Sequence, residues 1–301
     1  MNYRALAKKL KAALRDEKRL ETDSLIEDLE QDPAFRSARR SYLSALYDRA
    51  KASVFNSGVT VAEQRVLDTE KAYRRKLSEL NLTMDDVSYG TSCKICGDSA
   101  IVDGRICTCV LSQIKQAAEN LSDIPFTDKT FADFRLDLYE GEDAVRAARV
   151  LTFFKKWESG YPDVTKRLIT LSGKTGVGKS YLSAILATAL IERGYDVAYL
   201  NAFSLNKTFL KAHTSSIRER DEILSEITDA DVLFIDDLGV EQIYKNVTCE
   251  YLYDLLTERQ KKATLITTNL SPSMLLERYD ERIFSRLKGS VMLELTGKDL
   301  R

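Results

Sequence analysis

Long apolar runs and an excess of charge of either sign are both missing from this 301-residue sequence. No apolar run approaches the roughly 20 residues that span a bilayer, and residues 1–20 form a basic amphipathic stretch with no cleavage pattern. The formal net charge of −1 provides no global positive field, so any contact with nucleic acid must come from local basic patches. We therefore expect a cytoplasmic protein that does not act at a membrane.

Proline and glycine are scarce in the first part of the chain, with one of each between Tyr3 and Leu80. Leu6, Leu10 and Leu14 recur there at helical spacing, with basic residues between them. With 44% hydrophobic residues overall, the chain is too apolar to be disordered, and its length predicts two or three units. We predict a helical region at residues 1–90, in which most of the charged residues form solvated helix faces.

Histidine occurs once, at His213, whereas four of the five cysteines fall within one short segment. Cys93-x-x-Cys96 and Cys107-x-Cys109 provide the four thiolates that a tetrahedral Zn²⁺ site needs, and Asp103-Gly104 between the pairs is a strong hairpin signal. We predict a structural zinc module with a linker helix at residues 91–124. A redox-active Cys-x-x-Cys pair is the alternative, but it would not need the second pair.

The second half of the chain, from about Ile124 onward, alternates short β-rich apolar runs with helical segments. This pattern is typical of a parallel sheet covered by helices on both faces. The expected strands are Leu168–Ser172, Val197–Asn201, Val232–Ile235, Thr264–Thr268 and Val291–Leu295. The sequence therefore predicts an α/β domain with a five-stranded parallel sheet at residues 125–301.

A phosphate-binding motif, G-x-x-x-x-G-K-[ST], lies between the first of these strands and a helix, which is the context that the motif requires. Its residues are Gly173, Lys174, Thr175, Gly176, Val177, Gly178, Lys179 and Ser180. The glycines let backbone N–H groups converge on a phosphate, Lys179 reaches the β and γ oxygens, and Ser180 offers a hydroxyl to Mg²⁺. We predict that the loop binds a nucleoside triphosphate, ATP, and its product ADP, together with Mg²⁺.

Two carboxylates, Asp236 and Asp237, end a buried strand on the side of the sheet where ligands bind. We expect Asp236 to hold Mg²⁺ and Asp237 to orient or deprotonate the attacking water. Asp reaches less far than the Glu that many related sites carry, so the predicted ATPase is slow. Asn269, after the next strand, can bind a water or the γ-phosphate, although an Asn at that place is often only a turn former.

Arg282 and Arg286 lie four residues apart, so they share one face of a predicted helix. A guanidinium can neutralise the charge that develops on a transferred phosphoryl group, and a neighbouring subunit can supply it. The alternative is a solvated or salt-bridged helix face.

Taken in this order, these motifs resemble those of the AAA+ ATPases, and more narrowly the DnaC/DnaI-type replicative helicase loaders. The narrower resemblance rests on Leu238-Gly239, Thr130–Phe134, Ser285-Arg286-Leu287 and Gly297–Arg301. It implies that Phe131 and Phe134 lie near the adenine, that Arg286 is the arginine finger with Arg282 beside it, and that Arg301 is a second sensor.

The resemblance also implies partners and a function. Residues 1–90 would bind a DnaB-type ring helicase, the ATPase domain would self-associate, and single-stranded DNA would contact Asn201–Lys211, with Phe203, Lys207 and Phe209, and the loop Gln242–Lys245. Aromatic and basic residues interleave there as stacking on DNA requires, but ordinary helix packing explains them equally well. The expected function is ATP-dependent helicase loading. A transposition-type (IstB-like) ATPase and a nucleotide-binding DNA adaptor without significant hydrolysis are the alternatives.

Overall fold

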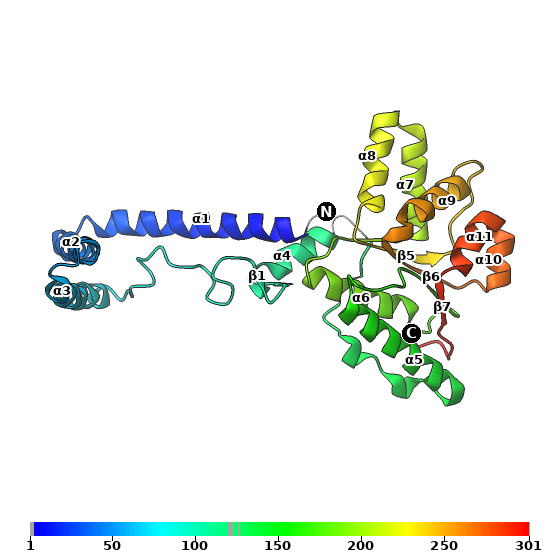
Figure 1. Cartoon of the computed structure of the whole chain (residues 1–301), viewed down its shortest axis with the longest axis horizontal. Coiled ribbons are helices and arrows are strands. Elements are labelled where there is room, and N and C mark those ends of the chain that lie inside the picture. The colour runs from blue at the N-terminus through cyan, green and yellow to red at the C-terminus, as the bar shows by residue number, and fades with distance from the viewer. Residues whose placement is uncertain (1–2, 120–122, 126, 301) are drawn as a thin grey trace. The chain divides into compact units, whose positions relative to one another are not determined.

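The computed structural model describes residues 3–119, 123–125 and 127–300 (Figure 1). The chain divides into two compact units, one formed by Lys8–Ser99 and the other by the residues on either side of that segment. The ranges 1–90, 91–124 and 125–301 remain a prediction for the functional domains. Among the described residues, no helix is both long and apolar enough to cross a membrane.

The N-terminal part is helical, as the sequence predicts, and consists of α1 (Tyr3–Leu29), α2 (Pro33–Phe55) and α3 (Val59–Glu79). Helix α2 has complementary end signals, because Asp32 accepts a hydrogen bond from the Ala34 N–H and Asn56 ends the helix with φ of 47°. A small cluster of buried side chains in the Lys8–Ser99 unit includes Phe35, Tyr73 and Leu77. The hairpin strands β1 (Ile101–Val102) and β2 (Arg105–Ile106) and helix α4 (Thr108–Glu119) follow.

The second half of the chain forms a five-stranded parallel sheet, which confirms the predicted fold class. Its strands are β3 (Leu168–Ser172), β4 (Val197–Asn201), β5 (Val232–Leu238), β6 (Ala263–Thr268) and β7 (Val291–Glu294), in the order β4-β5-β6-β3-β7. Strand β6 has a partner on each side, since β5 pairs with it on one side and β3 on the other. All six residues of β6 are buried, as expected for a central strand covered on both faces.

Helices cover both faces of this sheet (Figure 1). Helices α5 (Gly141–Gly160) and α6 (Lys179–Glu192) contact one face. The other carries α7 (Ala202–Thr214), α8 (Ile217–Thr228), α9 (Thr248–Glu258), α10 (Pro272–Arg278) and α11 (Glu281–Lys288). Short 3₁₀ turns, η1 (Phe131–Asp133), η2 (Leu136–Leu138) and η3 (Arg259–Lys261), complete the described elements.

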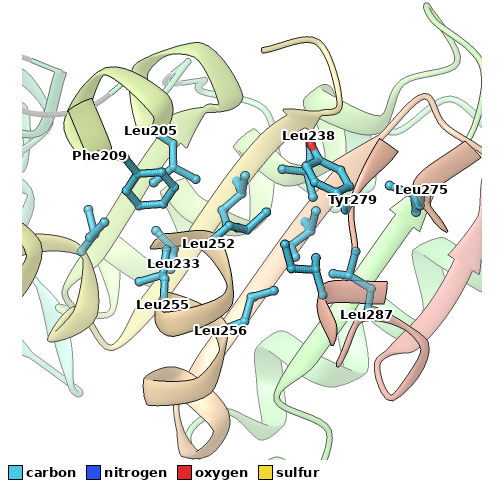
Figure 2. Close-up of a cluster of buried hydrophobic side chains, with 14 of the residues drawn as sticks. Leu205, Phe209, Leu233, Leu238, Leu252, Leu255, Leu256, Leu275, Tyr279 and Leu287 are labelled. Carbon is cyan, nitrogen blue, oxygen red and sulfur yellow. The ribbon is translucent and has the colours of Figure 1, made fainter. Parts of the chain in front are cut away.

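The apolar core on the second face holds the strands together at their carboxyl ends, where the polar residues lie. Leu205 and Phe209 from α7 and Leu252, Leu255 and Leu256 from α9 pack with Leu233 of β5, and Leu275, Tyr279 and Leu287 extend the cluster to α10 and α11 (Figure 2). Burying such side chains stabilises the fold by roughly 1.5–3 kcal/mol each. The core therefore holds the carboxyl ends of β3, β5 and β6 next to one another, where the sequence places its polar residues.

Candidate nucleotide-binding site

The phosphate-binding loop connects β3 to α6 and takes backbone conformations that only glycine adopts readily. Gly173, Gly176 and Gly178 have φ of 155°, 80° and 95°. At Gly173 a Cβ atom would lie 2.1 Å from the Leu295 carbonyl oxygen, so a side chain has no room. Because α6 begins at Lys179, its free N–H groups and dipole point toward the loop, an arrangement suited to an anion.

Lys179 lies at the centre of the site and is 4% exposed. Its Nζ donates to the carbonyl oxygens of Gly173 and Lys174 at 2.9 Å and to Asn269 Oδ1 at 2.5 Å. A buried ammonium needs such acceptors, because an unpaired charge in the interior is costly. The lysine therefore joins the loop after β3 to the end of β6.

Ser180 and Asp236, the two predicted magnesium ligands, are adjacent. The Ser180 hydroxyl donates to Asp236 Oδ1 at 3.1 Å. A hydroxyl and a carboxylate are oxygen ligands of the kind that Mg²⁺ takes in nucleotide sites, usually with water and phosphate oxygens in the remaining positions. The donor set fits the ion.

A threonine that the sequence analysis missed holds both acids in place. Strand β5 shifts register against β6 between Ile235 and Leu238, and Asp237 has φ of 55° within this irregularity. Thr267 Oγ1 donates to Asp236 Oδ1 at 2.5 Å and accepts the Asp237 N–H at 2.8 Å. Bulges often re-aim side chains next to functional sites, and here the bulge directs the second carboxylate toward the cavity, where Asp237 is a lining residue.

Asn269 lies between the lysine and the second acid. Its Oδ1 accepts the Lys179 ammonium, and its Nδ2 donates to Asp237 Oδ1 at 3.4 Å. This amide therefore contacts both the group expected to bind phosphate and the group expected to bind the attacking water.

A cavity of about 440 Å³ adjoins the loop, and aromatic rings line it. Phe134 stacks on Tyr139 with centroids 5.7 Å apart and on Tyr181 with centroids 6.3 Å apart. Apolar rings at this distance from a phosphate loop suit a nucleobase. Phe134 was expected here, whereas Phe131 lies on η1 and is not among the described residues that line the cavity.

Tyr139 also connects the base side of the cavity to the loop, which the sequence analysis did not foresee. Its hydroxyl donates to the Val177 carbonyl oxygen at 2.7 Å, and a Cβ on Gly178 would lie 3.0 Å from the same hydroxyl. Burial raises the pKa of Tyr139 to about 12. The only sequence signal for this role is an aromatic residue a few positions after Phe134.

The chain near its C-terminus lies against the phosphate loop. The Leu300 N–H donates to the Gly176 carbonyl oxygen at 3.0 Å, and Leu300 lines the cavity. A Cβ on Gly176 would fall 2.0 Å from Asp299 Oδ1, so a carboxylate lies directly beside the loop. Arg301, the expected second sensor, is outside the described residues.

The paired arginines are on α11, and both lie over one tyrosine ring. Their guanidinium carbons lie 4.9 Å (Arg282) and 4.4 Å (Arg286) from the centroid of the Tyr253 ring. Arg282 also forms ion pairs with Glu250 and Asp280. The described residues that line the cavity include neither arginine.

The residues expected to contact DNA have two different environments. Phe203 is 57% exposed, and Lys207 Nζ lies 4.3 Å from its ring centroid. Phe209 instead is 1% exposed and stacks on Tyr251 in the core. The expectation that Phe209 contacts DNA is therefore wrong, because the periodicity of α7 turns this aromatic residue toward the sheet. Gln242 and Lys245 in the other expected segment are exposed.

The four clustered cysteines converge as their spacing predicts. The sulfur atoms of Cys93, Cys96, Cys107 and Cys109 all lie within 4.8 Å of one another. In a tetrahedral site with Zn–S bonds of about 2.3 Å, the sulfurs are roughly 3.8 Å apart, so the donor set fits zinc. The Asp103-Gly104 turn is present, with φ of 49° and 76°, and β1 pairs antiparallel with β2.

Together, the loop after β3, the acids at the end of β5 and the amide after β6 define a P-loop nucleotide-binding domain of the AAA+ class. The chain belongs to the family described as IstB-like ATP binding protein, whose model matches residues 112–282, more than half of the chain.

Individual relatives match over part of their length. The replicative helicase loader DnaC of Escherichia coli (strain K12) is 26% identical over 119 residues, 39% of this chain and 48% of that protein. The insertion sequence IS21 putative ATP-binding protein of Pseudomonas aeruginosa is 28% identical over 160 residues, 52% of this chain and 54% of that protein. The chain thus spans about half the length of these curated relatives. A crystal structure of DnaI aligns over 58% of this chain and 91% of that chain, with 24% identity and a TM-score of 0.45.

Proposed function

We propose that the protein is an ATP-dependent loader of a ring-shaped replicative helicase, in which ATP controls assembly. The observation that carries this proposal is the division of the catalytic groups. Lys179, Asp237 and Asn269 line one cavity, whereas the described residues that line it do not include Arg286 of α11. A second copy of the chain would supply the arginine, so that hydrolysis would follow assembly.

Each residue of the site has a distinct task in this proposal. Lys179 neutralises the β and γ oxygens, and Asn269 holds the γ-phosphate or the attacking water. Asp237 orients and deprotonates that water. Ser180 and Asp236 would hold Mg²⁺, which would supply positive charge to neutralise the phosphate oxygens. The γ-phosphate contacts differ between ATP and ADP, and this difference biases the conformation of the assembly.

The N-terminal helices would bind the helicase. Leu43, Tyr47 and Val54 are 47%, 70% and 79% exposed, and their spacing of four and seven residues places them on one face of α2. Contiguous apolar residues on a surface mark sites of protein association. Phe203 and Lys207 would contact single-stranded DNA by stacking and charge.

The four cysteines would bind a structural zinc ion in the reducing cytoplasm. The short segment that contains them has little apolar surface to bury, so the metal would supply much of its folding free energy. No open coordination position is needed for this role. A redox-active pair, the alternative, would not require all four sulfurs to converge.

Co-purification with a replicative helicase in ATP and in ADP tests the proposal. We expect the full-length protein to retain the helicase in one nucleotide state, and Lys179→Ala to abolish the difference between the two. Lys155→Ala is the matched control, because Lys155 is an exposed lysine on α5, outside the loop. The absence of binding in both nucleotide states, with a folded protein, would overturn the proposal.

The similarity to the IS21 ATP-binding protein favours a second candidate, an ATPase that delivers a transposase to DNA. Binding to a transposase in place of the helicase in the same experiment would select it. A nucleotide-binding adaptor without hydrolysis is excluded if measured ATPase activity disappears in both Lys179→Ala and Arg286→Ala.

A further inference from the structure

Glu241 has a buried carboxylate that contacts two segments. One segment follows Asp236 and Asp237, and the other leads into α11, the helix that carries Arg286. Glu241 is 4% exposed and follows β5 closely. Its Oε2 accepts the Gly239 N–H at 2.8 Å, and its Oε1 accepts the Tyr279 hydroxyl and lies 3.8 Å from Arg278 Nε. The backbone carbonyl of Glu241 accepts a further hydrogen bond from the Arg278 guanidinium.

The segment on one side of this carboxylate is part of the nucleotide site. Asp237 has a left-handed backbone conformation, and Gly239 follows with φ of 113°. A Cβ on Gly239 would lie 2.5 Å from the Leu270 side chain, and Leu270 directly follows Asn269. A shift of Asp237 or Asn269 would therefore reach Gly239 through covalent and packed neighbours.

The segment on the other side leads to the arginine helix. Tyr279 is 3% exposed and directly precedes Asp280, whose side chain caps α11 by accepting the Ile283 N–H at 2.9 Å. Arg286 lies on the same short helix, less than two turns beyond this cap. The hydrogen bond between Tyr279 and Glu241 therefore anchors the start of the helix that carries the finger.

We propose that Glu241 is a positioning residue that couples the nucleotide site of one chain to the arginine that the same chain supplies to its neighbour. The inference rests on the composite site of the proposed function. Burying a carboxylate costs free energy unless donors surround it, and an apolar residue could fill the same volume. The two carboxylate oxygens of Glu241 accept hydrogen bonds from Gly239 and Tyr279, which belong to the two segments whose relative position matters for catalysis. Nucleotide bound to one chain thereby controls the position of the Arg286 that this chain supplies to its neighbour.

The test uses mixtures of full-length variants that separate the two roles of a subunit. Lys179→Ala lacks its own site but has a normal finger, and Arg286→Ala has a normal site but no finger. Mixing them restores ATPase activity if fingers act between subunits. We then combine Lys179→Ala with Glu241→Gln in one chain and mix it with Arg286→Ala. We expect at least a tenfold smaller restored kcat, with the KM for ATP within about twofold, because the finger is displaced while the working site is intact.

Tyr279→Phe, also combined with Lys179→Ala, is the second variant. It tests the coupling role of Glu241 if Glu241→Gln does not fold. It removes one hydroxyl and should lower the restored kcat in the same direction. Glu277→Gln is the matched control, because Glu277 is an exposed carboxylate on the preceding helix, and it should restore as well as the parent.

The outcomes distinguish a failure of the composite site from a failure of the coupling role of Glu241. If Lys179→Ala and Arg286→Ala do not complement each other, the composite site itself is wrong. If they complement and neither Glu241→Gln nor Tyr279→Phe lowers the restored kcat, the coupling role alone is overturned. A loss of thermal stability with kcat and KM unchanged would also overturn it, because that result describes a purely structural carboxylate.

Discussion

The Lys179 ammonium donates to Asn269 Oδ1 at 2.5 Å, and this contact joins the start of α6 to the residue that follows β6, 90 residues further along the sequence. A γ-phosphate would compete with the amide oxygen for the same ammonium. Asn269 would then be free to turn toward the phosphate or the attacking water. The pair is a direct link between phosphate binding and the acid Asp237, which the same amide contacts.

Removing the Asn269 side chain should therefore separate binding from hydrolysis. We expect Asn269→Ala to bind ATP within about threefold of the parent but to hydrolyse it roughly 10- to 100-fold more slowly, the effect of losing one polar contact to a charged transition state. Nucleotide titration and steady-state ATPase assays measure the two quantities. Equal losses in both would show that Asn269 serves binding alone.

Thr267 should control how well the site uses magnesium. Thr267→Val keeps the shape but removes the hydroxyl that Asp236 and the Asp237 N–H share. The lost contacts are worth about 1–3 kcal/mol, so we expect the Mg²⁺ concentration for half-maximal ATPase activity to rise roughly tenfold. Thr267→Ser retains the hydroxyl and should behave like the parent. An unchanged Mg²⁺ dependence in Thr267→Val would contradict the positioning role.

Asp299 should weaken ATP binding, because its carboxylate lies beside the loop that receives the phosphates. We expect Asp299→Asn to bind ATP roughly fivefold more tightly, about 1 kcal/mol, with a smaller gain at high salt. Asp128→Asn removes the same charge from a fully exposed side chain and serves as the control. Weaker binding in Asp299→Asn would mean that the carboxylate supports the loop or the metal.

Zinc should be required for the stability of the cysteine segment. The protein purified in reducing buffer should contain about one equivalent of zinc, and Cys107→Ser should lose most of it. A chelator should lower the melting temperature of the parent and leave Cys107→Ser almost unaffected. Cys249→Ser, outside the cluster, should retain the metal. Zinc well below half an equivalent in the parent would rule out the four-thiolate site.

Alkaline pH should break the link between Tyr139 and the phosphate loop. The pKa of Tyr139 is raised from 10.0 to about 12 by burial, so the neutral phenol is favoured in the folded protein. Its contribution to stability is fully present below pH 10 and is lost as the pH rises through 12. Urea unfolding between pH 9 and 12 should show this decline in the parent and a smaller one in Tyr139→Phe. Identical pH profiles of unfolding in the parent and Tyr139→Phe would show that the Tyr139 hydroxyl does not contribute to stability.

Much of the fold follows from local patterns. The five strands, the phosphate loop and the helical N-terminal region were all predictable because a buried parallel strand, a glycine-rich turn and a helix each impose their own residue spacing. Strand ends were less certain. Strand β5 continues to Leu238 because a register shift accommodates Asp237, and no spacing rule reveals such an irregularity.

The supporting residues of the site were not predictable in the same way. Thr267 reads as one more β-branched strand residue, and Glu241 as a loop acid. Their roles appear only when β6 lies beside β5 and when α10 and α11 pack on the core. Phe209 shows the opposite case, since an aromatic residue that suits DNA stacking proved to be a core residue.

The sequence by itself determined the class of the domain, its phosphate loop and the identity of its acids, because these depend on contiguous residues whose chemistry is set by the backbone around them. Only the tertiary structure decided which distant side chains meet them. Hydrogen bonds such as those of Thr267 and Glu241 depend on the register of neighbouring strands and on helix packing, and the burial of the whole core sets that arrangement.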